Sequence, residues 1–217
     1  MGSIWEMNAI SLIKAGGPIM IPLLLCSIFA VGIIIEKMIY FALIRTNPKQ
    51  LKKNVFDLIK ANKIKESIHL CDQDRSPLSR ILKAGIVKFG STREDIKENI
   101  EDISLYVIPK LESRLNALAT IAHISPLLGL LGTVTGMTAS FHTIQIRAAS
   151  LNPVTPGDLA GGIGEALLTT VAGLMIAIPA FVAYNYLVNR VNQIVLEMER
   201  GATELINLMN QISRSGT

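Results

Sequence analysis

The chain has 217 residues, half of them hydrophobic and only 18% charged, with a mean hydropathy of +0.43. Soluble domains are seldom this apolar, so the composition excludes an ordinary soluble globular protein and indicates a membrane protein. The net charge of +4 then reflects membrane topology and attraction to anionic lipid rather than nucleic-acid binding.

Three apolar stretches are each long enough to cross a hydrocarbon core of about 30 Å as a helix. They are Pro18–Phe41, Ile121–Ile144 and Ile163–Val188. The sequence therefore predicts an all-α integral membrane protein. Its segments, in chain order, are an N-terminal amphipathic helix (1–17), transmembrane helix 1 (18–42), a helical domain (43–119), transmembrane helix 2 (120–146), a loop (147–160), transmembrane helix 3 (161–188) and a C-terminal helix (189–217).

The distribution of cations predicts the orientation, because Lys and Arg near membrane ends are retained in the cytoplasm. Fifteen of them lie between Arg45 and Arg114, whereas the 147–160 loop has only Arg147 and the N-terminal segment only Lys14. We expect the 43–119 domain and the C-terminal helix to be cytoplasmic. The N-terminus and the 147–160 loop are expected in the periplasm.

The residues before the first span are amphipathic and predict a helix lying in the membrane interface, with Ser3 and Glu6 spaced as a capping box. The two cysteines, Cys26 and Cys71, are expected on opposite sides of this topology, so a structural disulfide between them is not expected. Neither cysteine has metal-ligand spacing, and no metal site is predicted.

The 43–119 segment shows helical periodicity throughout. Ser76 and Pro77 are typical of an N-cap followed by a first helical position, and Gly90 of the end of that helix. We therefore expect a short amphipathic helix in this part of the domain.

A longer helix follows, and it opens with a capping box in one of two registers: Ser91 with Glu94, or Thr92 with Asp95. Its apolar stripe continues into the second span without a stop signal. We expect Pro109 and Pro126 to bend this helix rather than to end it. The residues of the stripe are Ile96, Ile100, Ile103, Val107, Leu111, Leu115 and Leu118.

The third span is also expected to continue as a helix beyond the membrane. A heptad seam follows it, formed by Val188, Val191, Val195, Met198, Ala202, Leu205, Met209 and Ile212. The extensions of the second and third spans are expected to form a cytoplasmic helical bundle. The seam packs either within the chain or also against neighbouring copies, and a heptad alone does not identify its partner.

Small residues recur one turn apart in the second and third spans, which favours close helix packing in a membrane. They are Gly129, Gly132, Gly136, Gly173 and Ala177. The first span is rich in Ile, Leu and Phe and is expected to face lipid. Between the other two spans, Thr155, Pro156 and Asp158 predict an N-cap, a first-turn proline and an acidic third residue.

Glu165 is an ionisable residue within the third apolar stretch, where charge is costly and residues of this kind are usually functional. Alternatively, a glutamate near a helix start is an inter-subunit hydrogen-bonding post or interacts weakly with the helix dipole. Threonines in the two inner spans suit the wall of a narrow, partly hydrated passage, although such hydroxyls commonly bond a carbonyl one turn back. These threonines are Thr133, Thr135, Thr169 and Thr170.

Other polar or helix-breaking residues of the spans have simpler interpretations. Pro179, like Pro126, is expected to kink its span. His123 and His142 lie near the two ends of span two and are interpreted as interfacial residues rather than proton relays.

At two places the sequence resembles the ExbB/TolQ proton-channel family, distantly related to MotA. The matching runs are SPLLGLLGTVTGMTASF (Ser125–Phe141) and GGIGEALLTTVAGLMIAIPAFVAYN (Gly161–Asn185). The resemblance covers both inner spans and the three-span order, and these motifs are specific. This chain departs from the familiar pattern with Thr135 in place of an aromatic residue and Thr169 in place of alanine. Which threonine of each pair matters most is therefore left open.

The resemblance implies a homopentamer in the inner membrane of Gram-negative bacteria around two copies of a single-span partner of the ExbD/TolR type. That partner brings an aspartate, and the spans of this chain contain none. Thr133 and Thr170 would be pore-facing hydroxyls, and Glu165 the family's span-three glutamate. The implied coupling ion is the proton, with no other cofactor, and the implied client is a protein of the TonB or TolA kind.

Two functional hypotheses follow. The first is a proton-driven motor subunit, most similar to ExbB and with TolQ as the nearest alternative. The second is a passive membrane scaffold or small-solute transporter subunit, in which Glu165 binds a cation or pins helices together. An enzyme is not expected, because the sequence has no phosphate loop, metal cluster or nucleophile beside a base.

Overall fold

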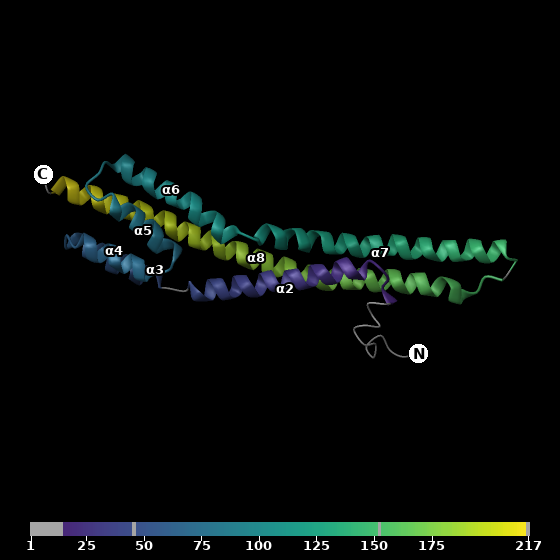
Figure 1. Ribbon diagram of the computed structural model, residues 1–217. Coiled ribbons are helices and arrows are strands. Elements are labelled where there is room, and N and C mark those ends of the chain that lie inside the picture. Colours follow the sequence, from purple (N-terminus) through teal and green to yellow (C-terminus); the bar gives the residue numbers. More distant parts are fainter. Residues whose placement is uncertain (1–14, 45–46, 152, 216–217) are drawn as a thin grey trace. The chain divides into compact units, whose positions relative to one another are not determined.

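The computed structural model of the protein describes residues 15–44, 47–151 and 153–215, with side chains as far as Ile212. These residues form helices and contain no strand, which confirms the all-α fold class (Figure 1). The amphipathic helix expected over residues 1–17 lies, up to residue 14, outside the described residues. The helices are α2 (Met20–Leu43), α3 (Pro48–Lys60), α4 (Ile64–Gln73), α5 (Pro77–Val87), α6 (Arg93–Glu112), α7 (Leu115–Ala149) and α8 (Pro156–Ser215).

The chain divides into two compact units, each built from separate stretches of sequence. One, here called the membrane unit, comprises the residues up to Ile35 together with Arg114–Asn185. The other, called the bundle unit, comprises Glu36–Ser113 and the residues from Tyr186 onward. Helices α2 and α8 each contribute to both units.

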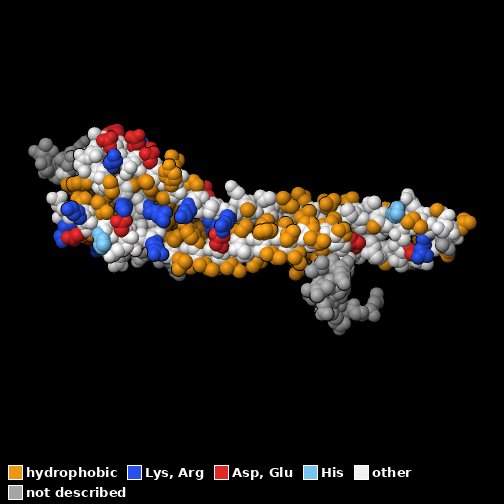
Figure 2. Space-filling model, in the orientation of Figure 1, with side chains coloured by type: hydrophobic (Ala, Val, Ile, Leu, Met, Phe, Trp, Pro, Cys, Tyr) orange, Lys and Arg blue, Asp and Glu red, His pale blue; other side chains and the backbone are white. Residues whose placement is uncertain are grey.

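The membrane unit contains most of α2, all of α7 and the first half of α8. The helices that include these segments are long and apolar enough to cross a membrane, as the sequence predicted. Large apolar side chains point outward, with Phe29 63% exposed and Met175 71% exposed. Figure 2 shows hydrophobic side chains along the surface formed by α2. Such a surface would be a liability in water and is expected where lipid is the solvent.

The bundle unit has a conventional aliphatic core. Val55, Leu82 and Leu205, from α3, α5 and α8, are all fully buried. Most positions of the heptad seam are buried as well, and α8 contacts α5 of the same chain where Gly201 faces Leu78. The seam thus packs against helices of its own chain, and the alternative that it also contacts neighbouring copies stays a prediction.

Helix starts in both units follow the local signals in the sequence. Ser76 caps α5 by accepting a hydrogen bond from the N–H of Ser79 at 3.2 Å. Of the two registers open for the capping box of α6, the Thr92–Asp95 register forms, with reciprocal bonds of 3.2 Å. These side chains satisfy N–H groups that lack partners in the first helical turn.

The expectation of one continuous helix from the bundle into the second span is wrong. Helix α6 ends at Glu112, and α7 begins at Leu115 after Arg114, which adopts a left-handed conformation with φ of 65°. The Nζ of Lys37, only 3% exposed, donates to the Leu111 carbonyl at 2.9 Å and contacts the Ser113 hydroxyl at 3.3 Å. A cation from a distant helix thus satisfies a carbonyl that the end of α6 leaves free. The apolar stripe from Ile96 to Leu118 does not predict this contact.

Candidate functional site

Helices α7 and α8 run side by side in the membrane unit, and their backbones touch (Figure 1). A methyl group on Gly136 would lie 2.5 Å from the Gly162 carbonyl oxygen, and one on Gly173 would lie 2.6 Å from that of Ser125. Such a separation leaves no room for any side chain. The glycines that the sequence predicted at a close helix contact lie at this contact between α7 and α8. Ala177, predicted with them, is also buried.

One hydroxyl reaches from α8 to α7 at the centre of this contact. The Thr170 hydroxyl donates to the Ala166 carbonyl at 3.1 Å and to the Gly129 carbonyl of α7 at 3.3 Å. In an α-helix the Gly129 carbonyl also accepts the N–H of Thr133, four residues on. The peptide of Thr133 and the hydroxyl of Thr170 therefore meet at one carbonyl. Both side chains remain partly exposed, and the Thr133 hydroxyl donates to Leu130 at 2.7 Å.

The other member of each threonine pair lies elsewhere. Thr169 is fully buried, and its side chain fills the space that the missing side chain of Gly132 leaves. Its hydroxyl donates to the Ala166 carbonyl at 2.9 Å. Thr135 is two residues after Thr133, about 200° around α7, and is exposed. The structure therefore separates the two pairs, and only Thr133 and Thr170 share the Gly129 carbonyl.

All four hydroxyls also bond a carbonyl three or four residues back in their own helix, the pattern named as the simpler interpretation. This bond does not prevent a second role, because a hydroxyl oxygen keeps its acceptor lone pairs while it donates. Thr133 and Thr170 can therefore each accept a hydrogen bond from a carboxyl group or a water molecule on their exposed side.

Glu165 has a neighbour that the sequence analysis missed. Its carboxyl group lies directly against the backbone of Gly17, where any added side chain would overlap it. Gly17 has φ of 69°, a conformation that side chains other than glycine rarely adopt, and it precedes α2. The available signal was the Gly16-Gly17-Pro18 run directly before the first apolar stretch.

Glu165 and Thr170 are not on the same face of α8. Five residues rotate an α-helix by about 140°, so the carboxyl group points toward the start of α2 while the Thr170 hydroxyl points toward α7. The membrane unit thus holds two separate polar positions: the half-buried carboxyl group of Glu165 beside Gly17, and the Thr170 hydroxyl at the Gly129 carbonyl, with the Thr133 hydroxyl close by on Leu130.

An ion pair closes the hairpin between the two inner helices. Arg147, in the last turn of α7, lies 2.8 Å from Asp158 in the first turn of α8. Asp158 also accepts hydrogen bonds from the Thr155 N–H at 2.8 Å and from the Thr155 hydroxyl at 2.7 Å. Backbone and side-chain bonds from Thr155, and to a smaller extent Arg147, hold the pKa of Asp158 below its usual value. The predicted start of this helix is confirmed.

The remaining predicted residues lie at less specialised positions. Pro126 is inside α7 and Pro179 inside α8, and the kinks expected there stay predictions. The His123 ring packs edge-on against Phe181 of α8 with ring centres 6.1 Å apart. Within the described residues, no group of three or more His, Cys, Asp or Glu side chains is placed to hold a metal ion.

Comparison with known proteins gives one consistent relationship. The model of the MotA/TolQ/ExbB proton channel family matches residues 73–200, which run from the end of α4 far into α8. An ExbB-like biopolymer transport protein of Synechocystis is 32% identical over 79% of this chain and 80% of its own length. The biopolymer transport protein ExbB of Neisseria meningitidis is 26% identical over 94% of this chain and 99% of its own.

A shorter match has a higher sequence identity. The Tol-Pal system protein TolQ of Haemophilus influenzae is 47% identical over 88 residues, which are 40% of this chain and 36% of its own. The family match covers more than half of the chain, including all of α7, the glycine-rich part of α8, and Thr133 and Thr170. This multi-pass membrane protein belongs to the MotA/TolQ/ExbB proton channel family.

Proposed function

We propose that this chain is the proton-channel subunit of an ExbB–ExbD-type motor, which converts proton motive force into mechanical work on a TonB-like envelope protein. The observation that carries the proposal is the hydrogen bond from the Thr170 hydroxyl of α8 to the Gly129 carbonyl of α7, one turn before Thr133, whose hydroxyl bonds the adjacent Leu130 carbonyl. It offers partly exposed hydroxyls from two facing helices where backbone groups are already paired. A proton carrier passing this position finds acceptors at little cost in reorganisation.

The mobile carboxyl group in this mechanism comes from a partner. No aspartate occurs in the three apolar stretches of this chain, so a single-span protein of the ExbD/TolR type supplies it. A proton from the periplasm neutralises that aspartate, which removes the cost of moving a charge past the apolar wall. Thr133 and Thr170 then hydrogen-bond the neutral acid or the water beside it.

The energy for work comes from the membrane potential. Each proton yields about 2.3 kcal/mol per 100 mV, enough to drive a discrete rotation or tilt of the partner. In this proposal five copies of the chain surround two copies of the partner in the bacterial inner membrane. The N-terminus is periplasmic, and the bundle unit is cytoplasmic. An odd ring around an even core cannot satisfy all contacts at once, which favours stepping.

Glu165 has a separate task in this proposal. Its place beside Gly17 puts a carboxyl group at the start of α2, away from the Thr133 and Thr170 hydroxyls. It takes up or releases protons near the outer end of the path rather than at Gly129. The passive scaffold hypothesis instead predicts that Glu165 only pins α8 to the start of α2.

The TolQ branch is the second candidate function, favoured by the 47% identity over 88 residues. A TolQ-type subunit would use the same proton path and drive a TolA-like protein in envelope constriction. The two candidates differ in the client and not in the chemistry of the site.

The decisive experiment is proton flux into liposomes that contain the chain alone or with its single-span partner. Flux should require the partner, and Thr170→Val should reduce it at least tenfold while the complex still assembles. Thr135→Val is the matched control, because its hydroxyl makes the same kind of bond on another face of α7. We expect this control to keep most of the flux.

Glu165→Gln separates the motor from a scaffold. A motor subunit should lose flux with the complex intact, since glutamine fills the same space without a titratable proton. Normal flux in both Thr170→Val and Glu165→Gln would contradict the proposed path. Loss of the complex in Glu165→Gln, with unchanged helix content, would favour the scaffold.

A further inference from the structure

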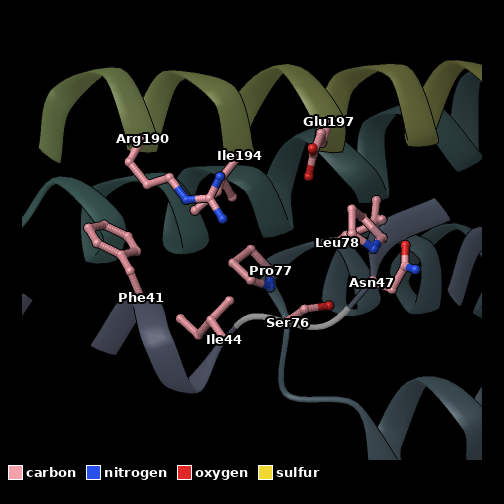
Figure 3. A pocket seen from close by; sticks show the side chains of 10 residues that line it. Phe41, Ile44, Asn47, Ser76, Pro77, Leu78, Arg190, Ile194 and Glu197 are labelled. Carbon is pink, nitrogen blue, oxygen red and sulfur yellow. The ribbon is translucent and has the colours of Figure 1, made fainter. Parts of the chain in front are cut away.

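The bundle unit contains a pocket of about 410 Å³ that the proton path does not use (Figure 3). Its walls come from the end of α2, the starts of α3 and α5, and one face of α8. Phe41 of α2 and Ile44, the residue directly after this helix, form one wall, while Arg190, Ile194 and Glu197 line the α8 side. Two opposite charges therefore share a partly apolar pocket.

The pocket lies at the end of two predicted membrane spans. Phe41 is the last residue of the first apolar stretch, and Arg190 is two residues beyond the end of the third at Val188. The lipid headgroup layer begins at this level of the helices. Arginine and lysine side chains at this level of transmembrane helices bind the phosphate of lipid headgroups, and Arg190 is such a side chain.

The two charges have a defined order along α8. Figure 3 shows the side chains of Arg190 and Glu197 directed to the same pocket. Seven residues separate them, which is two helical turns and about 10.5 Å along the axis. Arg190 is the nearer of the two to the membrane span, and Glu197 is farther from it. The flexible side chains can bring their charged ends closer together than this.

The chemistry of the pocket matches one class of lipid. A phosphatidylethanolamine headgroup carries its phosphate next to the glycerol and its primary ammonium at the far end. The phosphate would meet the guanidinium of Arg190, which bonds Gln193 through one nitrogen at 3.3 Å and has other donors left in its fork. The ammonium would meet Glu197. Phe41 and Ile44 would cover the beginning of an acyl chain.

We propose that this pocket binds the phosphoethanolamine headgroup of a membrane phospholipid, with the phosphate on Arg190 and the ammonium on Glu197. The bound lipid fills the space between the end of α2 and α8 and fixes the bundle unit to the membrane surface. Phosphatidylglycerol offers Arg190 a phosphate but gives Glu197 no cation. Phosphatidylcholine offers Glu197 a cation without an N–H donor.

The test is retention of defined lipids by the full-length protein in native mass spectrometry, after exchange into phosphatidylethanolamine, phosphatidylglycerol or phosphatidylcholine. Wild type should retain phosphatidylethanolamine best. Arg190→Gln should weaken retention of both phosphatidylethanolamine and phosphatidylglycerol by about tenfold, the usual effect of losing a charge-assisted hydrogen bond. Glu197→Gln should weaken only phosphatidylethanolamine, since the glycerol headgroup makes no contact that needs a carboxylate.

The controls separate a specific site from general charge and from misfolding. Arg200→Gln removes an exposed cation of α8 that does not line the pocket, and it should change nothing. Arg190→Lys keeps the charge and should recover part of the retention. Retention that ignores the headgroup, or that falls equally in Arg200→Gln, would overturn the proposal. Displacement of the lipid by an equal concentration of free phosphoethanolamine would overturn the assignment to a lipid.

Discussion

The membrane unit and the bundle unit use glycine in opposite ways. In the membrane unit, the atoms that face Gly136 and Gly173 at 2.5 and 2.6 Å from an added methyl group are backbone carbonyl oxygens. In the bundle unit, the atoms that face Gly85 and Gly201 at 2.5 and 2.6 Å are the terminal methyl groups of leucines. The distances are almost equal, but a leucine can change rotamer and a helix backbone cannot.

This difference follows from the two solvents. Lipid gives helices little hydrophobic reason to associate, so α7 and α8 depend on backbone contact and van der Waals packing. Water drives the bundle unit together through burial of side chains such as Leu82 and Leu205. A similar helical pattern thus gives two kinds of interface, and each can be perturbed separately.

The largest effect is expected from adding one methyl group to the backbone contact. Gly136→Ala must push α7 away from the Gly162 carbonyl, and overpacking of this kind costs about 1–3 kcal/mol. Thermal unfolding in detergent should show the loss. Gly201→Ala is the matched control in the bundle unit, where movement of Leu78 and the better helix propensity of alanine should keep the change under about 1 kcal/mol. Equal losses in both variants would contradict the comparison.

The next effect concerns the buried cation of the bundle unit. Lys37→Met keeps the length of the side chain but leaves the Leu111 carbonyl without this donor, which costs about 1–3 kcal/mol. Hydrogen exchange should report faster opening of the last turn of α6 than of α3. Lys60→Met, an exposed lysine at the end of α3, is the control variant. Unchanged protection near Leu111 in Lys37→Met would show that the contact does not hold the helix end.

Lowering the pH should destabilise one helix start in each unit. Hydrogen bonds from Thr155 lower the pKa of Asp158, and those from Thr92 lower the pKa of Asp95, both from an ordinary value of 3.8. A lowered pKa in the folded state adds stability above the unfolded value, and this stability is lost as the pH falls through the folded value. Both helix starts should therefore weaken below about pH 4.

Unfolding measured between pH 7 and pH 3 checks this expectation. Asp158→Asn and Asp95→Asn should each flatten the acid side of the stability curve, whereas Asp57→Asn, outside any cap, serves as control. Salt sharpens the comparison, because Asp158 also pairs with Arg147 and screening should reduce its contribution more than that of Asp95. The same salt dependence for both acids would indicate that the Arg147 pair is unimportant.

The smallest effect is a difference in reactivity with no change in stability. Cys71 is buried in the bundle unit, and burial, with the nearby carboxylates of Asp72 and Asp74, raises its pKa to about 12. Its thiol should therefore resist maleimide at pH 8 in the native protein and react after unfolding. Labelling in a Cys26→Ala background measures this directly. Rapid native labelling would show that the bundle unit opens at this position.

The sequence predicted much of the fold because several signals are local. Hydrophobic length identified the three spans. Side chains near the helix starts identified Thr155 with Asp158 and gave Thr92 with Asp95 as one of two possible registers, of which the structure forms this one. Glycines one turn apart identified the face that α7 presents to α8. In each case the partners lie within a few turns of one helix or within one hairpin, so spacing along the sequence reduces the choice to one or two pairs.

Other features needed contacts between residues far apart in the chain. The apolar stripe continues across Ser113 and Arg114 and does not predict the helix break there. Lys37, which donates a hydrogen bond to the Leu111 carbonyl at the end of α6, lies 74 residues earlier in the sequence. The contact between Glu165 and Gly17 and the pocket lined by Arg190 likewise bring together residues that are far apart in the sequence. Sequence patterns do not encode such pairs without knowledge of how the helices pack.

By itself, the sequence determined that this protein is helical, crosses a membrane with three apolar stretches, and carries the paired motifs of its family. Only the tertiary structure decided which hydroxyl reaches the Gly129 carbonyl, which threonine is buried, and where the carboxyl group of Glu165 lies. The physical reason is that periodicity assigns a residue to a face of its helix, whereas the neighbour of that face depends on the rotation and register of the packed helices.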